Sequence, residues 1–303
     1  MSLLVIGSMA FDSVETPFGK VEDVLGGSGT FFSVAASYFT DVRLVAVVGN
    51  DFPEEHLQML RERNIDLAGV TMADGATFRW KGRYGFELNE AQTLDTQLNV
   101  FADFKPQLPA DYADSDFVFL ANIDPELQSE VLSQVRRPRL IAADTMNFWI
   151  SGKRDALLKT LKGVDLLVIN EGETRQLAGE ANLVKAAKVV MNMGPKTLIV
   201  KRGEYGVLMF SEGEIFAAPA YPLEEVFDPT GAGDTFAGGF MGYLAATKNL
   251  DPQNVRRAIV YGSVMASFTV EDFSLNRLKA LTMEEIDGRF KQFKLMTEFI
   301  DGQ

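Results

Sequence analysis

Residues 228–240 read Asp-Pro-Thr-Gly-Ala-Gly-Asp-Thr-Phe-Ala-Gly-Gly-Phe. Gly231, Ala232 and Gly233 directly precede Asp234, at the start of a segment whose apolar residues recur with helical spacing. Glycines let a ligand approach the backbone closely, and a helix start directs unpaired N–H groups and the positive end of the helix dipole to the same point. We therefore predict an anion cradle with an acid set inside it, suited to holding a phosphoryl group while a base acts on its acceptor.

Outside this stretch, short apolar runs alternate with amphipathic segments of helix length over most of the 303 residues. We expect strands at 3–8, 44–49, 117–121, 140–144, 166–170 and 197–201. We expect helices at 29–39, 54–63, 125–135, 183–193, 234–246 and 254–269. Continuous runs of Val, Ile and Leu are typical of parallel strands buried on both faces. The alternation predicts an α/β three-layer sandwich with a mainly parallel central sheet, whose ligands bind beyond the carboxyl ends of the strands.

Two regions, residues 13–25 and 74–100, lack this periodicity. Within the second, residues 77–86 alternate, with aromatic and β-forming residues on one face and basic residues among the others. This pattern predicts a small β-sheet that projects from the main domain as a lid or an interface, and an ordinary surface hairpin is the alternative. No internal repeat or low-complexity linker occurs, so we expect residues 1–303 to form a single domain carrying that lid.

Composition excludes several classes of protein. The formal net charge of −13 argues against a nucleic-acid partner, since phosphate backbones demand a basic surface. The absence of cysteine excludes disulfides, thiol nucleophiles and thiolate metal sites, and it fits a cytoplasmic location. The apolar start lacks a basic leading segment and is typical of a strand rather than a signal peptide. No stretch approaches about 18 uninterrupted apolar residues, so we expect no membrane span.

Two common phosphate-binding motifs are absent. No G-x-x-x-x-G-K-[S/T] run occurs anywhere in the sequence, which excludes a P-loop. The glycines at 231 and 233 do not complete G-x-G-x-x-G, because Phe236 occupies the third glycine position. The cradle therefore belongs to neither of these two classes.

Residues 228–239 resemble the C-terminal signature of the ribokinase-like carbohydrate and nucleoside kinases, the PfkB family. In that family, the Gly-Ala-Gly-Asp element supplies an anion hole and an aspartate base. The resemblance implies that Asp234 is the catalytic base and that Gly231, Ala232 and Gly233 form the anion hole. It spans residues 3 to 275 and implies a ribokinase-like fold.

Further matches follow in the order that the family has them. Asp12 ends a first-strand motif whose aspartate holds acceptor hydroxyls, and Gly26 and Gly27 resemble the diglycine element that lets the acceptor approach the backbone. Asn170 and Glu173 resemble the N-x-x-E motif that positions magnesium near the phosphates. Each motif alone has an ordinary reading as a turn or a helix cap. Their joint occurrence around one cradle favours the functional interpretation.

The resemblance also implies an ATP site in which the adenine lies between the turn at 203–206 and residues 261–267 of the following helix. The residues that it places there are Lys201, Gly203, Gly206, Thr230, Gly262, Ser263 and Ala266. The glycines at 203 and 206 fit a hairpin between two strands equally well. The implied cofactors are ATP and Mg²⁺, and a monovalent cation is left open because some relatives need one.

The sequence departs from the family near the acceptor. Many members carry an asparagine after the diglycine, where this chain has Phe31, preceded by Thr30. Core packing is the default for Phe31; otherwise it shapes an acceptor pocket that stacks a base or excludes a common sugar. Asn147 falls in a segment where sugar kinases often carry D-x-N-x-R, and the arginine is missing here.

That missing arginine serves acidic sugars and sugar phosphates in the family, so its absence lowers the case for a charged acceptor. Arg79, Lys81 or Arg83 of the expected lid could replace it.

We therefore predict ATP-dependent phosphotransfer to a hydroxyl of a small sugar-like acceptor. The rival within this class is a nucleoside kinase. A non-catalytic sugar- or nucleotide-binding regulator is the alternative from another class, and the intact Asp234 argues against it. The expected partner is a small molecule, and a homodimer through the lid is a hypothesis that rests on the resemblance alone.

Overall fold

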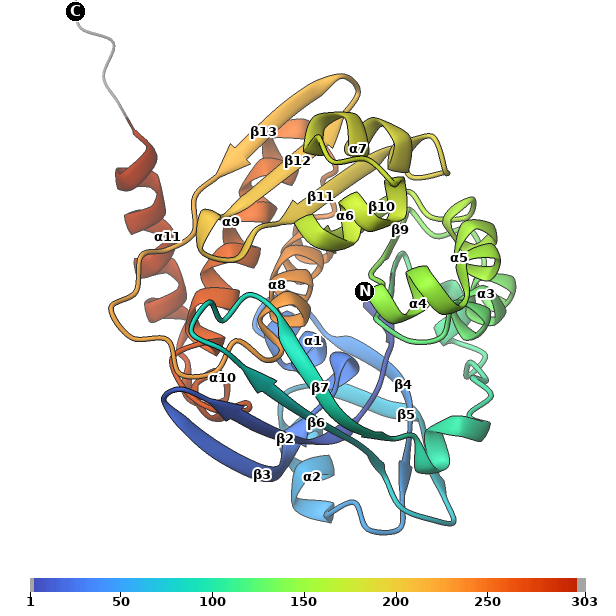
Figure 1. The fold of residues 1–303 in the computed structure, drawn as a ribbon. Coiled ribbons are helices and arrows are strands. Elements are labelled where there is room, and N and C mark those ends of the chain that lie inside the picture. The colour runs from blue at the N-terminus through green and yellow to red at the C-terminus, as the bar shows by residue number, and fades with distance from the viewer. Residues whose placement is uncertain (1–2, 299–303) are drawn as a thin grey trace, which may run out of the picture.

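The computed structural model describes residues 3–298, and its main element is a nine-stranded sheet in the order β13-β12-β11-β10-β9-β8-β1-β4-β5 (Figure 1). Its strands are β1 (Leu3–Ile6), β4 (Val42–Gly49), β5 (Ile65–Ala73), β8 (Phe117–Leu120), β9 (Leu140–Ala143), β10 (Leu166–Asn170), β11 (Thr197–Lys201), β12 (Val207–Ser211) and β13 (Glu214–Ala218). Neighbouring strands from β5 to β11 pair in parallel, and β12 and β13 add an antiparallel edge. The predicted mainly parallel central sheet is confirmed.

Helices cover both faces of this sheet. Alternate residues of β1 enter two separate cores, Leu3 and Val5 on one side and Leu4 and Ile6 on the other. The first core is covered by α1 (Ser28–Ala36), α2 (Glu54–Glu62), α8 (Ala232–Thr247), α9 (Pro252–Thr269), α10 (Asn276–Ala280) and α11 (Met283–Thr297). The second is covered by α3 (Pro125–Gln134), α4 (Asn147–Gly152), α5 (Arg154–Leu161), α6 (Glu171–Ala178) and α7 (Leu183–Met191). The three-layer arrangement follows from strands that are apolar on both faces.

A second sheet, called the small sheet below, has four strands in the order β3-β2-β6-β7. They are β2 (Ala10–Thr16), β3 (Gly19–Gly26), β6 (Phe78–Tyr84) and β7 (Ala91–Gln97). The parallel pairing of β2 with β6 joins the two regions that lacked helical periodicity. The small sheet is therefore confirmed, and an isolated surface hairpin was the wrong alternative; its service as a lid stays a prediction.

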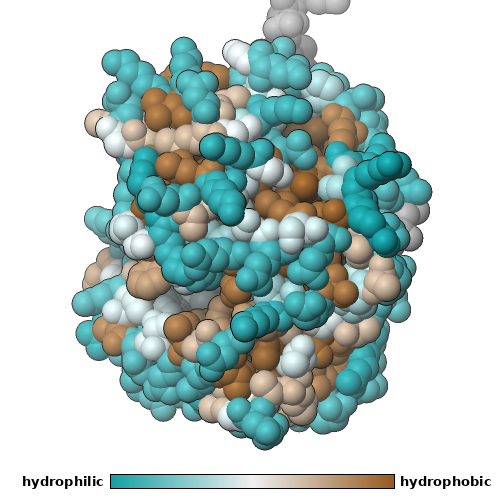
Figure 2. All heavy atoms as spheres, turned by 90° about the vertical axis from the view of Figure 1, so that its right-hand side faces the viewer, coloured by the Kyte–Doolittle hydropathy of each residue, from teal (hydrophilic) through white to brown (hydrophobic). Residues whose placement is uncertain are grey.

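Other differences from the expected elements have local causes. The first strand ends at Ile6 rather than residue 8, because the chain turns at Gly7 against α1, where a Cβ on Gly7 would lie 2.6 Å from the Gly29 nitrogen. None of the helices within residues 3–298 is long and apolar enough to cross a bilayer. Figure 2 views the right-hand side of Figure 1, where hydrophobic residues lie in small groups among hydrophilic ones.

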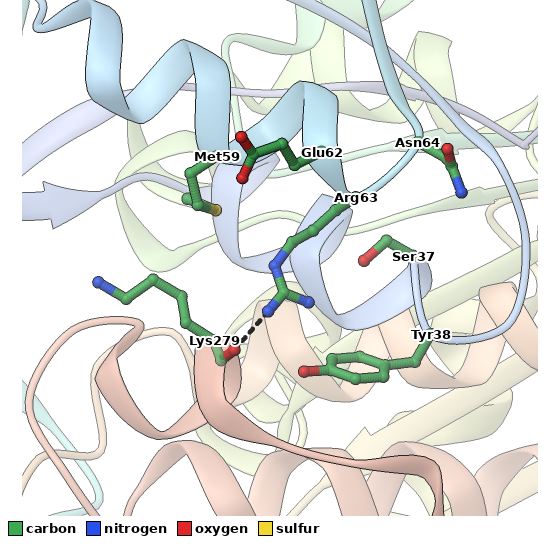
Figure 3. A pocket seen from close by; sticks show the side chains of 7 residues that line it. All are labelled: Ser37, Tyr38, Met59, Glu62, Arg63, Asn64 and Lys279. Carbon is green, nitrogen blue, oxygen red and sulfur yellow. Dashed lines mark hydrogen bonds between the residues drawn. The ribbon is translucent and has the colours of Figure 1, made fainter.

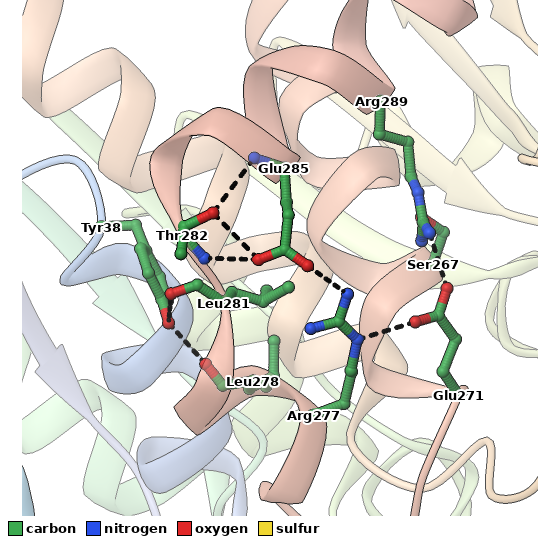
Figure 4. A network of polar contacts seen from close by, with 9 residues as sticks. All are labelled: Tyr38, Ser267, Glu271, Arg277, Leu278, Leu281, Thr282, Glu285 and Arg289. Carbon is green, nitrogen blue, oxygen red and sulfur yellow. Dashed lines mark hydrogen bonds and ion pairs between the residues drawn. The ribbon is translucent and has the colours of Figure 1, made fainter.

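A polar network fastens the C-terminal helices to α9 (Figure 4). Glu271 accepts hydrogen bonds from Arg277 Nε at 2.9 Å and from Arg289 Nη2 at 2.6 Å. Arg277 also donates to Glu285 at 2.7 Å, and the Arg289 guanidinium lies 3.5 Å from the centre of the Phe268 ring. These contacts join α9, α10 and α11 behind the helix that begins with the predicted cradle.

Candidate active site

Helix α8 begins at the predicted cradle. Gly231 is its N-cap, with φ of 75°. A Cβ placed on Gly231 would lie 2.5 Å from three atoms of the Phe31 ring, so both the backbone conformation and the packing require glycine here. A Cβ on Gly233 would lie 2.8 Å from Lys201 Nζ. The Ala232 N–H donates to Pro229 O at 3.2 Å, which closes the turn. The glycines thus hold a narrow turn between an aromatic ring and a cation.

Asp234 stands in the first turn of α8. Its pKa is raised to about 7, mainly by burial, with the negative charge of Asp144 adding to the rise and Lys201 opposing it. A free aspartate has a pKa of about 3.9 and is a weak base at neutral pH. A carboxylate with a pKa near the working pH is a better proton acceptor. The environment of Asp234 therefore suits the role of a general base.

Lys201, whose side chain is 19% exposed, lies beside the cradle. Lys201 ends β11, and its Nζ lies 3.2 Å from Asp144 Oδ2, after the end of β9. Burial by itself lowers the pKa of Lys201, but the charges of Asp144, Glu173 and Asp234 outweigh it and raise the pKa above the usual value. Lys201 is therefore a fixed cation beside the anion cradle, a place that its sequence position alone did not reveal.

Asn170 and Glu173 begin α6 as a capping box. Asn170 Oδ1 accepts from the Glu173 N–H at 2.7 Å, and Glu173 Oε2 accepts from the Asn170 N–H at 2.8 Å. These two hydrogen bonds confirm the helix-cap interpretation, and they engage one side-chain oxygen of each residue. Burial and the charge of Asp144 raise the pKa of Glu173 to about 7. Mg²⁺ usually keeps several waters and takes only one or two carboxylates, so Glu173 fits a water-mediated site, which stays a prediction.

The diglycine makes room for Asp12. A Cβ on Gly26 would lie 1.9 Å from Asp12 Oδ2, so only glycine leaves room for this carboxylate, and the next residue, Gly27, has a φ of 97°. The pKa of Asp12 is raised to about 7, mainly by burial, with the Gly27 backbone opposing the rise and the charges of Asp228 and Asp234 adding to it. Asp12 and Asp234, which are distant in sequence, therefore lie close enough for their charges to interact.

The remaining predicted acceptor residues differ in exposure. Thr30 is 0% exposed and Phe31 1%, within α1. Phe31 belongs to the core, as an aromatic residue on a helix does by default, and its ring supports Gly231 from below. Asn147 is exposed at the first residue of α4. Contact between any of the three and an acceptor stays a prediction.

Most of the predicted nucleotide residues lie in the turn after β11 or on α9. Several of the glycines among them are required by close packing of the backbone. Gly203 and Gly206 flank the turn between β11 and β12, and a Cβ on Gly206 would lie 2.2 Å from Ala218 O. A Cβ on Gly262 would lie 2.7 Å from Phe236 O, so this glycine lets α9 pack closely on α8. On α9, Ser263 and Ala266 are half-buried, one turn apart. Their contacts with ATP stay predictions.

The small sheet contacts two turns of the site, one at Thr230 and one at Gly203. The sequence did not reveal these contacts. Tyr84 ends β6 and its hydroxyl lies 3.4 Å from Thr230 Oγ1, while burial raises its pKa and the charges of nearby acids, Asp12 and Asp234 among them, add to the shift. In the following loop, the Asn89 side chain lies against Gly203, where a Cβ would be 2.0 Å from its Oδ1. The alternating pattern of residues 77–86 was the one signal in the sequence that could have pointed to Tyr84, since it places Tyr84 on the same face of the strand as Trp80.

The two arginines of β6 are engaged elsewhere. Arg79 pairs with Asp51 at 3.0 Å and with Asp23, and Arg83 pairs with Glu15 at 3.1 Å. These pairings leave both arginines unsuited to replacing the arginine of the acidic-sugar kinases.

A separate pocket lies away from this site, between the C-terminal ends of α1 and α2 and the helix α10 (Figure 3). It is lined by Ser37, Tyr38, Met59, Glu62, Arg63, Asn64 and Lys279. Arg63 donates to the Lys279 carbonyl and lies 5.2 Å from the Tyr38 ring centre. The pocket contains none of the predicted site residues.

Comparisons with known proteins agree with this geometry. The family described as pfkB family carbohydrate kinase matches residues 2–280. A cytidine kinase of Thermococcus kodakarensis is 31% identical over 249 residues, covering 80% of this chain and 87% of that protein. Two solved structures share the fold: a nucleoside kinase of Methanocaldococcus jannaschii (TM-score 0.76, 18% identity, 96% and 98% coverage) and a putative ribokinase II of E. coli in complex with ATP and Mg²⁺ (TM-score 0.75, 20%, 96% and 99%). The chain therefore belongs to the pfkB family of carbohydrate kinases, and it is a sugar or nucleoside kinase with the ribokinase fold.

Proposed function

We propose that this kinase transfers the γ-phosphoryl group of ATP to a hydroxyl of a small acceptor, with Asp234 as the general base. The observation that carries the proposal is the position of Asp234, a half-buried carboxylate with a pKa raised to about 7 in the first turn of the cradle helix. Asp12, whose pKa is raised to the same region, faces it from β2. An acceptor held at Asp12 would present a hydroxyl to Asp234.

Phosphoryl transfer depends on positioning and on charge stabilisation. The backbone of Gly231 to Gly233 would bind the transferred group at the positive end of α8. Lys201 lies against Gly233 and would neutralise charge that develops there. The acceptor hydroxyl loses its proton to Asp234 as its oxygen bonds to phosphorus, and ADP leaves with the electrons of the broken bond. Mg²⁺ would screen the polyphosphate when bound, with Glu173 and Asn170 holding its water ligands.

The nucleoside kinase alternative has a specific observation in its favour. The relative at 31% identity over 80% of this chain is a cytidine kinase, and a sugar hydroxyl is the acceptor group in both classes. We therefore keep sugars and nucleosides in one acceptor panel. No observation within residues 3–298 specifically favours the regulator alternative.

A monovalent cation is a further part of the proposal. Asp228 is 1% exposed, and its Oδ2 atom has no hydrogen-bond partner within residues 3–298. A buried carboxylate oxygen without a partner is costly unless a cation approaches it. We expect turnover to be higher in potassium chloride than in tetramethylammonium chloride at equal ionic strength, and equal rates would remove the cation from the proposal.

A homodimer through the small sheet would use its outer strand. Every residue of β7 is exposed, and Phe86 in the preceding loop is 90% exposed. Light scattering that gives the mass of a monomer at working concentration would count against the dimer.

The proposal is tested by ADP release from the purified protein with ATP, Mg²⁺ and a panel of sugars and nucleosides. Asp234→Asn should lose about 10² to 10⁴ of kcat on any active acceptor, the usual worth of a general base. Asp155→Asn is the matched control, because Asp155 also stands in the first turn of a helix but is exposed. ADP release by Asp234→Asn at the rate of the control would show that Asp234 is not the base.

A further inference from the structure

Trp80 forms a flat surface on the small sheet. A Cβ on Gly82 would lie 2.1 Å from one carbon of the Trp80 indole and 2.4 Å from another, so the ring lies over the backbone of Gly82. Trp80 Nε1 donates to Thr93 Oγ1 at 3.3 Å on the adjacent strand, which uses the ring's only polar group. Glycine within a strand forfeits side-chain packing, and here the close approach of the indole gives it a reason.

This surface is on the same side of the small sheet as Asp12. The parallel register of β2 and β6 pairs Asp12 with Trp80 and Val14 with Gly82. Paired residues point to the same face of a sheet, and residues two apart on a strand do so as well. Asp12, Trp80 and Tyr84 therefore share one face, and the contact of Tyr84 with Thr230 shows that this face turns toward the cradle.

Among the described residues of the small sheet, this face offers no cation to an acceptor. Arg79 and Arg83 alternate with Trp80 and Gly82 along β6, so they belong to the opposite face, where Asp51 and Glu15 pair with them. What the acceptor meets is a carboxylate for its hydroxyls and an apolar aromatic plane beside it. A charged acceptor finds no counter-charge there, and a bare sugar leaves most of the indole uncovered.

We propose that the acceptor is a nucleoside, whose base stacks on the Trp80 indole while its sugar hydroxyls bind Asp12. This assignment rests on the phosphotransfer function proposed above and names its substrate class. Base–aromatic stacking tolerates any base, because every base has a π-face. Trp80 therefore selects for a planar ring, and it leaves the choice among bases to other contacts.

Binding can be measured without turnover. The chain has two tryptophans, Trp80 and Trp149, so Trp149→Phe leaves Trp80 as the single indole fluorophore. In the presence of a non-hydrolysable ATP analogue, cytidine and adenosine should quench its emission in a saturable way, and ribose should not. Quenching by ribose equal to that by the nucleosides, or no quenching by either nucleoside, would overturn the stacking assignment.

Turnover supplies the second test. Trp80→Leu should raise KM for the best nucleoside about tenfold or more with kcat nearly unchanged, and Trp80→Phe should restore most of the loss, since a ring is kept. Circular dichroism and the melting temperature check that both variants fold. Higher kcat/KM on free sugars than on all nucleosides, or equal KM for wild type and Trp80→Leu, would contradict the nucleoside assignment. If no acceptor gives ADP release but nucleosides still quench the fluorescence, the phosphotransfer proposal is overturned. The proposed stacking of a base on Trp80 would then still be supported.

Discussion

Lys201 Nζ lies 3.2 Å from Asp144 Oδ2 and would lie 2.8 Å from a Cβ on Gly233. One ion pair thus connects the ends of two sheet strands with the start of α8. The cation is balanced by Asp144 and faces Glu173 and Asp234. Replacing either partner of this pair would leave a buried charge uncompensated.

We expect Lys201→Met to lower kcat about 10² to 10³-fold, the usual cost of removing one preorganised electrostatic group. Lys201 lowers the pKa of Asp234, so its loss should also move the acidic limb of the kcat/KM profile to higher pH. Lys196→Met, at an exposed position before β11, is the control. An unchanged pH profile in Lys201→Met would place the lysine outside the catalytic electrostatics.

Asp234 should also set opposite pH dependences for activity and stability. The base must be deprotonated, so kcat/KM should rise through pH 7. The pKa of Asp234 is higher in the folded protein than in the unfolded chain. Between about pH 4 and 7 the folded state therefore binds more protons than the unfolded state, and the free energy of unfolding falls as the pH rises through this range.

Thermal unfolding of the ligand-free protein at pH 5 and pH 8 measures this effect. Asp234→Asn should be more stable than wild type at pH 8, by about 1–3 kcal/mol, since it has no buried charge to ionise. The difference should shrink at pH 5. A variant that is less stable than wild type at pH 8 would contradict the raised pKa.

The Gly231 position offers a matched pair of substitutions. Gly231→Ala adds a methyl group 2.5 Å from the Phe31 ring at a φ of 75°, whereas Gly213→Ala meets open space at a φ of 84°. Both substitutions carry a similar backbone cost of about 1–2 kcal/mol, so the additional loss of unfolding free energy in Gly231→Ala, the excess, reports the clash with Phe31. We expect this difference in the loss of unfolding free energy to be about 1–3 kcal/mol, as in overpacked cores. Turnover of Gly231→Ala should fall as well, because the cradle is distorted.

Denaturant unfolding gives both free energies. In the Phe31→Leu background the excess should diminish, because a smaller side chain can yield to the methyl group. An excess that is the same with and without the phenylalanine ring would show that the ring does not constrain the cradle.

Glu271→Gln should weaken the attachment of α10 and α11 without touching the reaction. Glu271 accepts from both Arg277 and Arg289, so we expect a loss of about 1–3 kcal/mol in the free energy of unfolding. Glu284→Gln, exposed in the first turn of α11, should change stability by less than about 0.5 kcal/mol. A kcat that falls more than twofold in Glu271→Gln would link the network to catalysis.

Local patterns were enough to predict the cradle and most of the parallel sheet. The 228–240 run is contiguous, and β10 and β11 are uninterrupted apolar runs, so their predicted bounds match those observed. β5 was missed because it lies at the sheet edge, where only part of its surface is buried and its apolar pattern is irregular. β12 and β13 form the opposite edge and are recognisable mainly through their pairing.

The parts of the site that escaped prediction depend on distant pairings. Asp144 and Lys201 are 57 residues apart and meet only because β9, β10 and β11 lie side by side. The stacking of Trp80 over Gly82 depends on a side-chain rotamer, and its place beside Asp12 depends on strand register. The order of residues along the chain specifies neither of these.

The β6–β7 hairpin contacts Thr230 through Tyr84 and the Gly203 turn through Asn89. One hairpin therefore touches the turns beside both proposed ligand sites. As the predicted lid, it would have to swing away before either ligand could exchange with solvent. Entry of ATP and of the acceptor, and departure of ADP and of the phosphorylated product, would then share a single gating motion. We expect that motion, rather than the transfer itself, to limit turnover, so that higher solvent viscosity slows kcat.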